Sequence, residues 1–179
     1  MSSSMTPEHK LLVQNFILRK IDFPELERDF SATIDEGYLL NELTGVATSK
    51  DGEALECLIA LAYRIGFTDS IGRLLSKLLI ENWHEEHEEI ARILQFKVKI
   101  LESLDDLTKA IALKFDYMIE RGNYEPFVIK CMHAIADLHT EASTSKLKEL
   151  ANSKDPIIKK AAQYQLERLE RKEPEPLVS

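Results

Sequence analysis

The feature that most constrains this chain is the spacing of its apolar residues, which recur every three or four positions along most of the sequence. Such spacing places apolar side chains on one face of a helix. It is clearest after residue 51, in the segments 53–65, 69–82, 85–101, 105–119, 126–138, 143–151 and 156–169. Since no segment alternates apolar and polar residues around an Asn-Gly or Asp-Gly turn, the sequence predicts an all-α protein.

Residues that begin and end helices divide these segments. Thr6-Pro7 and Asp155-Pro156 each place an N-cap residue before a proline, and Thr68 precedes another helical segment. Gly66 is typical of the position just after a helix end. We expect a break at Asp22-Phe23-Pro24, because the residue before a proline avoids helical backbone angles. The sequence therefore predicts a series of short helices joined by short turns.

The predicted helices form pairs that recur every 30 to 40 residues, since Ala60 and Ala134 begin similar segments 74 positions apart. The clearest unit contains, in order, Ala134-Ile-Ala-Asp-Leu138, Ser143-Thr-Ser-Lys-Leu147-Lys-Glu-Leu150, Asp155-Pro156, Lys159-Lys160, Ala161-Ala162, Leu166 and Leu169. A short turn with Asp-Pro, followed by basic and then small residues, resembles the HEAT repeat family.

The resemblance implies a right-handed α-α superhelix, that is, a short HEAT-like solenoid of antiparallel helix pairs. The repeats would cover residues 52–170, and the helices of residues 1–50 would cap the exposed end of the array. We expect one domain over residues 1–171 and a disordered tail at 172–179, which is charged and rich in proline. Proteins of this family usually serve as binding scaffolds.

Composition narrows the class of protein. The 31 acidic residues exceed the 23 basic ones, giving a net charge of −8, which argues against binding to nucleic-acid phosphates. No apolar run approaches the roughly 20 residues that span a bilayer, and the start MSSSMTPEHK does not resemble a secretory signal. We therefore expect a soluble, cytoplasmic protein that is a monomer when free and makes no contact with a membrane.

Motifs that carry chemistry are absent from the sequence. It contains no GxSxG, GxxxxGK[ST], GxGxxG or HExxH motif. We therefore predict that the chain is not an enzyme and has no catalytic residues, no cofactor and no metal. Cys57 and Cys131 lie beside apolar residues and are predicted to be buried, inert thiols. His133 and Asp137, four residues apart, are interpreted as a surface pair on one helix face.

The strongest candidate for a functional site is an acidic stretch around the single tryptophan, comprising Glu81, Trp83, His84, Glu85, Glu86, His87, Glu88 and Glu89. Three interpretations compete. The spacing Glu81-x-x-His84 matches half of a di-iron carboxylate site, but no second Glu-x-x-His occurs. The glutamates could instead only stabilise the positive end of a helix. They could also form, with an exposed tryptophan, a surface that recognises a partner.

Charge along the chain favours the recognition interpretation. Residues 51–95 contain nine acids and four bases, whereas residues 141–179 contain seven acids and eight bases. Negative potential of this kind attracts a cationic partner. The leading hypothesis is a protein-binding module, most specifically an acidic immunity or antitoxin-like protein that neutralises a basic, nuclease-type toxin. The alternatives are a generic scaffold, a chaperone or lyase-like helper, and a HEAT-like enzyme that processes nucleic acid, which the acidity disfavours.

Overall fold

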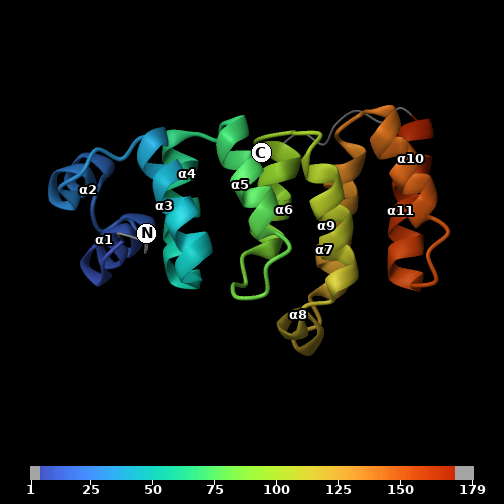
Figure 1. Ribbon diagram of the computed structural model, residues 1–179, viewed down its shortest axis with the longest axis horizontal. Helices are drawn as coiled ribbons and strands as arrows, with labels where there is room; N and C mark the ends of the chain where they lie inside the picture. Colours follow the sequence, from blue (N-terminus) through green and yellow to red (C-terminus); the bar gives the residue numbers. More distant parts are fainter. Residues whose placement is uncertain (1–4, 172–179) are drawn as a thin grey trace. The chain divides into compact units, whose positions relative to one another are not determined.

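The computed structural model describes residues 5–171, and these residues form eleven helices and no strand (Figure 1). The bounds of the helices are α1 Pro7–Ile17, α2 Phe23–Phe30, α3 Glu36–Ser49, α4 Gly52–Ile65, α5 Asp69–Leu78, α6 His87–Phe96, α7 Ser103–Leu113, α8 Asp116–Glu120, α9 Tyr124–Ala136, α10 Glu141–Leu150 and α11 Pro156–Glu170. The predicted all-α class is confirmed. The tail that we expected to be disordered, residues 172–179, lies outside the described residues.

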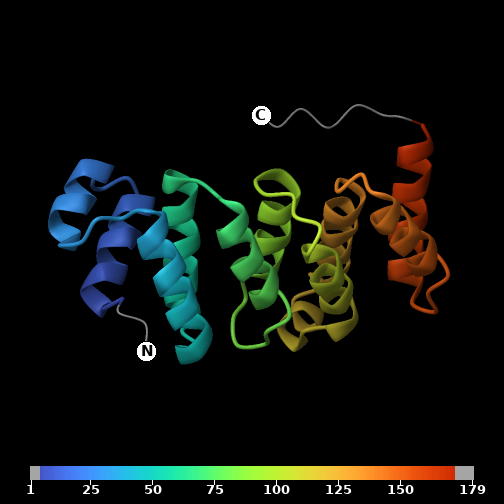
Figure 2. The ribbon, with the colours of Figure 1, turned by 45° about the horizontal axis from the view of Figure 1, so that its top comes forward.

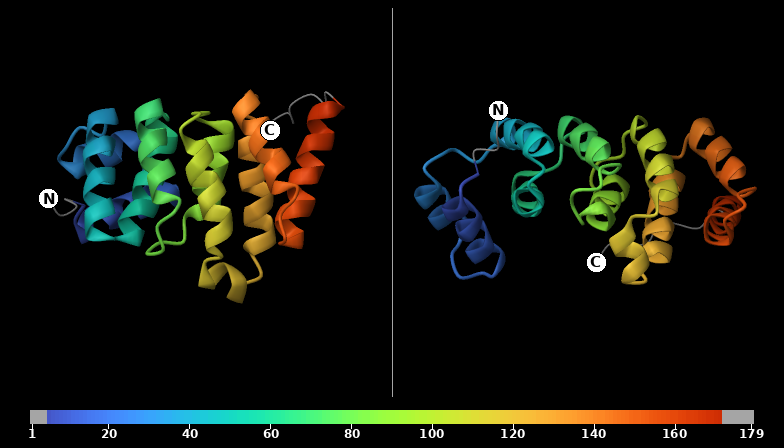
Figure 3. Two further views of the ribbon diagram at one scale, coloured as in Figure 1. Left: turned by 45° about the vertical axis from the view of Figure 1, so that its right-hand side comes forward. Right: turned by 60° about the horizontal axis from the view of Figure 1, so that its bottom comes forward.

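The chain divides into two compact units, of which the first ends at His87 and the second begins at Glu88. In the first unit α1 packs on α2 and α4, and α3 packs on α4 and α5. Figure 2 shows α3 and α4 side by side. In the second unit α9 packs on α7, α10 and α11, and α10 packs on α11, as the two views of Figure 3 show. Most of these contacts join helices that are adjacent or next but one in the chain.

Side chains just before the helices explain where many of them begin. The side chains of Thr6, Thr68 and Asp155 accept hydrogen bonds from backbone N–H groups in the first turns of α1, α5 and α11, as predicted. Gly66 ends α4 with a φ of +119°, a conformation that favours glycine. None of the helices in residues 5–171 is long and apolar enough to cross a membrane.

The break expected at Asp22-Phe23-Pro24 is confirmed in part. The chain leaves the helix after Ile17, and Asp22 caps α2 in a capping box with Glu25, but Phe23 and Pro24 belong to α2. The bounds of two predicted helices are clearly wrong. The helix expected over 85–101 begins at His87 and ends at Phe96. The helix expected over 105–119 is two helices, because Lys114 adopts a left-handed conformation with a φ of +48° and ends α7.

Each helix buries one apolar face against its neighbours, and this burial holds each unit together. Leu75 of α5 is fully buried, whereas Leu166 of α11 is only half-buried. Leu166 lines a surface groove with Leu169 of α11 and with His139, which lies just before α10. The apolar spacing would place Leu166 in the core with Leu75, but it lies at the edge of the core instead. The HEAT-like arrangement of repeats, with residues 1–50 as a cap, stays a prediction.

Replacing Leu75 by alanine should lower the free energy of unfolding by about 2–5 kcal/mol, because it leaves a cavity in a closed apolar environment. Its neighbour Leu74 is half-buried and gives a matched control on the same helix. Leu74→Ala should cost clearly less. Urea unfolding followed by circular dichroism measures both variants, and equal losses would mean that the orientation of α5 is wrong.

Candidate functional site

The acidic stretch lies mostly in the loop between α5 and α6, and α6 begins within it at His87. His84 and His87 organise this loop. The Nε2–H of His84 donates to the carbonyl oxygen of Leu78 at 2.8 Å, and its Nδ1 accepts the backbone N–H of Glu86 at 3.1 Å. The Nε2–H of His87 donates to the carbonyl oxygen of Glu81 at 2.7 Å. Both rings therefore hold the loop backbone as neutral imidazoles.

The two histidines are buried and lie against each other. Their ring centroids are 4.3 Å apart with an interplanar angle of 20°, and the side chains are 4% and 0% exposed. Burial lowers the pKa of both rings, and for His87 the nearby His84 adds to the effect and the pKa falls to about 3. His84 and His87 are thus structural in this conformation and do not face a partner, contrary to the expectation that they share the recognition surface.

Trp83 is not fully exposed. Its ring is half-buried and meets the ring of His84 edge to face, with 4.8 Å between centroids. Its indole Nε1 is buried and has no hydrogen-bond partner among the described residues. The same loop packs on the start of α4, where a Cβ on Gly52 would lie 3.7 Å from the backbone oxygen of Trp83. The indole of Trp83 is therefore partly covered rather than fully exposed, and the backbone of its loop lies close to α4.

The five glutamates of the stretch divide into two groups. Glu88 and Glu89 belong to the first turn of α6, and each forms an ion pair, Glu88 with Lys130 of α9 and Glu89 with Arg92 at 2.9 Å. Glu85 is exposed, whereas Glu81 and Glu86 are partly exposed. The dipole interpretation thus fits Glu88 and Glu89, and Glu85 is the most exposed of the five.

No group of three His, Cys, Asp or Glu side chains within residues 5–171 is arranged to hold a metal ion. Both ring nitrogens of His84 already bind backbone groups, so the half-motif Glu81-x-x-His84 has no free ligand nitrogen. Cys57 and Cys131 are buried as predicted, and burial raises the pKa of both thiols, that of Cys57 to about 11.

The interpretation of His133 and Asp137 as a surface pair is wrong. Asp137 is 4% exposed, and its carboxylate accepts a hydrogen bond from the Nε2 of Gln95 at 2.7 Å and forms an ion pair with Arg168. The three residues come from α6, the end of α9 and α11. Sequence reasoning missed this network, although an aspartate between Ala136 and Leu138 in an otherwise apolar segment was a usable signal.

Comparison with protein-family models, with curated proteins and with solved structures finds no match to this chain. The likeness to HEAT repeats therefore depends only on the sequence pattern of residues 134–169. The function has to be inferred from the candidate site.

Replacing His87 by glutamine should flatten the pH dependence of stability. Because the pKa of His87 in the folded chain lies near 3, below its ordinary value of 6.5, the unfolded chain binds more protons at acidic pH. The free energy of unfolding is therefore fully retained above pH 6.5 and falls below it, by up to about 1.4 kcal/mol per pH unit for one such group. Glutamine retains an N–H donor for the Glu81 carbonyl but does not titrate. Urea unfolding at pH 7, 6 and 5 measures both slopes, and equal slopes would contradict the assignment.

Replacing Arg168 by leucine should cost about 3–5 kcal/mol of stability, because it leaves the buried Asp137 carboxylate without its cation. Arg171 offers a matched control on α11, since its ion pair with Glu167 leaves both side chains about 60% exposed. Arg171→Leu should cost less than about 1 kcal/mol. Chemical denaturation gives both values, and similar small losses would show that the network around Asp137 is dispensable.

Proposed function

We propose that this chain is a non-enzymatic protein-binding module, and that its first unit binds a protein with a basic surface. In its most specific form the proposal is an immunity or antitoxin-like protein that neutralises a nuclease-type toxin in the cytoplasm and is a monomer when free. The observation that carries the proposal is the uneven distribution of charge between the two units.

Charge is concentrated in the first unit. Residues 1–87 contain 15 acidic and 8 basic residues, a net charge of −7, whereas residues 88–179 contain 16 acidic and 15 basic residues, a net charge of −1. Ten of the 15 acids in the first unit are exposed, and one, Glu42, is buried. Seven of its eight basic residues are also exposed, so acids exceed bases at its surface without excluding them. A net negative surface raises the association rate with a positively charged partner.

Packing along the chain supports the binding scaffold. In α3–α5 and in α9–α11 each helix contacts its neighbour or the helix next but one, as stacked helix pairs do. The contact between α1 and α4 joins helices that are three apart in the chain. It is the contact expected of a terminal helix that covers the exposed apolar end of the stacked helix pairs. We therefore propose a short HEAT-like solenoid, whose exposed loops and helix faces bind a protein.

The acidic stretch contributes only part of the proposed surface. His84 and His87 hold the loop from inside, and Glu88 and Glu89 are neutralised by Lys130 and Arg92. Glu85, with the partly exposed Glu81 and Glu86, is the portion that meets solvent. The proposed contact region is this loop together with exposed acids of the helices before it, such as Glu27 of α2 and Glu56 of α4.

The alternatives differ in the partner they require. A HEAT-like enzyme acting on nucleic acid needs clustered basic residues to bind phosphates. The net charge of −7 on the first unit disfavours a nucleic-acid binding site in that unit. A scaffold or a chaperone or lyase-like helper would bind a partner without regard to the sign of its charge. The charge of the bound protein therefore distinguishes these functions.

Affinity purification of the tagged chain from its own cells, followed by mass spectrometry, tests the proposed function. We expect a stoichiometric partner with a basic surface, whose nuclease activity, if it has one, falls to background when one equivalent of this chain is added. A partner that is acidic or neutral, or a nuclease that stays fully active in the complex, would contradict the proposal.

Neutralising three exposed acids of the first unit, in the variant Glu27→Gln, Glu56→Gln, Glu85→Gln, should slow association with that partner about tenfold at low salt. The effect should shrink at 0.5 M salt, since charge interactions are then screened over a few ångströms. Stopped-flow or surface-binding kinetics measures both rates.

The matched control neutralises three exposed acids of the second unit, in the variant Asp105→Asn, Glu120→Gln, Glu141→Gln. It removes the same charge from the molecule and should leave the association rate within about twofold of the original. Equal slowing by both triple variants would indicate a general effect of net charge and would contradict a contact surface on the first unit.

A further inference from the structure

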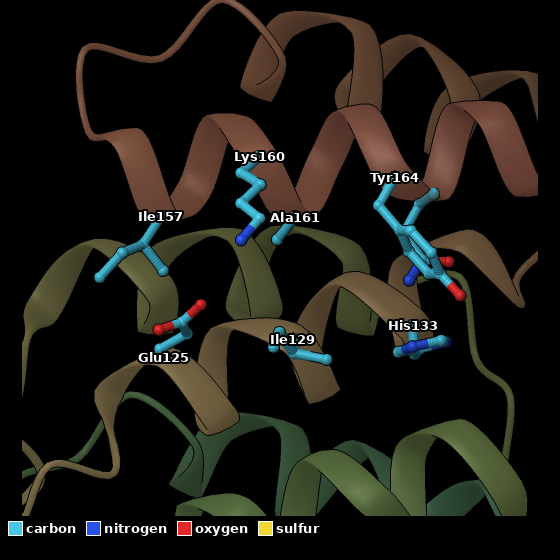
Figure 4. Close-up of a pocket in the computed structure, with 8 residues that line it drawn as sticks. Glu125, Ile129, His133, Ile157, Lys160, Ala161 and Tyr164 are labelled. Atoms are coloured by element: carbon cyan, nitrogen blue, oxygen red, sulfur yellow. The ribbon is translucent and has the colours of Figure 1, made fainter.

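The second unit contains a pocket that the proposed function does not use. It lies between α9 and α11, which pack against each other, and encloses about 310 Å³. Glu125, Ile129 and His133 line it from α9, and Ile157, Lys160, Ala161, Tyr164 and Gln165 line it from α11 (Figure 4). Its volume is at the lower end of the range for small-molecule pockets, about 300–1,000 Å³.

One end of the pocket carries buried polar atoms that lack partners. Gln165 is 1% exposed, and its Oε1 has no hydrogen-bond partner among the described residues. The Nδ1 of His133 is likewise buried without a partner among residues 5–171. Buried polar atoms are nearly always hydrogen-bonded in folded proteins. Both atoms belong to residues that line one cavity, and a ligand bound there can supply the missing hydrogen-bond partner once these side chains turn toward it.

The charge state of this end is fixed by its surroundings. Burial lowers the pKa of His133, and the guanidinium of Arg168 lowers it further, so the ring is neutral near pH 7. Arg168 itself is held by Asp137. A neutral imidazole and a carboxamide can bind an uncharged hydroxyl or N–H group, and neither favours an anion.

The middle of the pocket is apolar and ends at an aromatic ring. Ile129 and Ala161 lie there, and Tyr164, which is 53% exposed, lies at the same end as His133 in Figure 4. The ring centroids of Tyr164 and His133 are 6.2 Å apart. An exposed tyrosine ring above apolar walls is a surface on which another aromatic ring packs.

The opposite end carries one charge of each sign. Glu125 and Lys160 come from facing helices and lie near Ile157 in Figure 4. Neither forms an ion pair with another residue that the structure describes. Glu125 and His133 are eight residues apart on α9, about 12 Å along the helix axis. An ammonium and a carboxylate on one ligand would match Lys160 and Glu125 in sign.

We propose that this pocket binds a free aromatic amino acid whose ring carries a hydrogen-bond donor, that is, tyrosine or tryptophan. The ring donor binds the Oε1 of Gln165, and a phenol oxygen can also pair with the Nδ1 of His133. The ring packs between Tyr164 and the apolar walls. The ligand's ammonium faces Glu125 and its carboxylate faces Lys160. This proposal does not depend on a protein partner for the first unit.

The test is an NMR titration of the full ¹⁵N-labelled chain with L-tyrosine, L-phenylalanine and tyramine. Tyrosine should shift the amide signals of residues around Ile129, Ala161 and Gln165. Phenylalanine lacks only the ring hydroxyl and should bind about tenfold more weakly, the worth of one hydrogen bond. Tyramine lacks the carboxylate that faces Lys160 and should also bind more weakly.

Gln165→Met should abolish the preference for tyrosine over phenylalanine without weakening phenylalanine. Gln163→Met is the matched control, because Gln163 lies on the same helix but is exposed and does not line the pocket. Ala161→Leu should fill the cavity and remove binding of all three ligands, with the amide spectrum elsewhere showing that the variant is folded.

Three results would overturn the proposal. They are the absence of shifts at about 2 mM tyrosine, a concentration in the range of weak ligand affinities, equal binding of tyrosine and phenylalanine to the original chain, and a preference for tyrosine that persists in Gln165→Met.

Discussion

The structure depends on one constraint, which is that each short helix can bury its apolar face only against helices close to it in the chain. The described helices are 5 to 15 residues long, too short to be stable alone. Leu75 of α5 and Phe127 of α9 are fully buried within their own units. Because local neighbours supply the core, the opposite helix faces stay available for charge, and in the first unit that charge is strongly negative.

Features with local causes could be predicted from the sequence. Thr6 and Asp155 cap helices because each side chain reaches backbone N–H groups two or three residues away. The thiols of Cys57 and Cys131 are buried because apolar residues surround them on helix faces. The break at Lys114 could not be predicted, because a left-handed lysine has no specific sequence signal.

Features with tertiary causes could not be predicted. The ion pair of Asp137 with Arg168 joins residues 31 positions apart, and spacing alone made Asp137 and His133 look like a surface pair. The sequence places His84 and His87 in an acidic stretch and predicts that they face a partner. In the structure their rings are buried and donate hydrogen bonds to the carbonyl oxygens of Leu78 and Glu81, which hold the loop backbone. A polar residue becomes structural when the backbone around it needs a partner, and the residue type does not reveal that need.

We propose that the first unit carries the partner surface, and hydrogen–deuterium exchange of the whole chain, with and without its bound partner, tests this. We expect slower exchange in exposed segments of residues 5–87, including the loop at Glu85, and unchanged exchange in α10 and α11. Protection confined to residues 88–171 would contradict it.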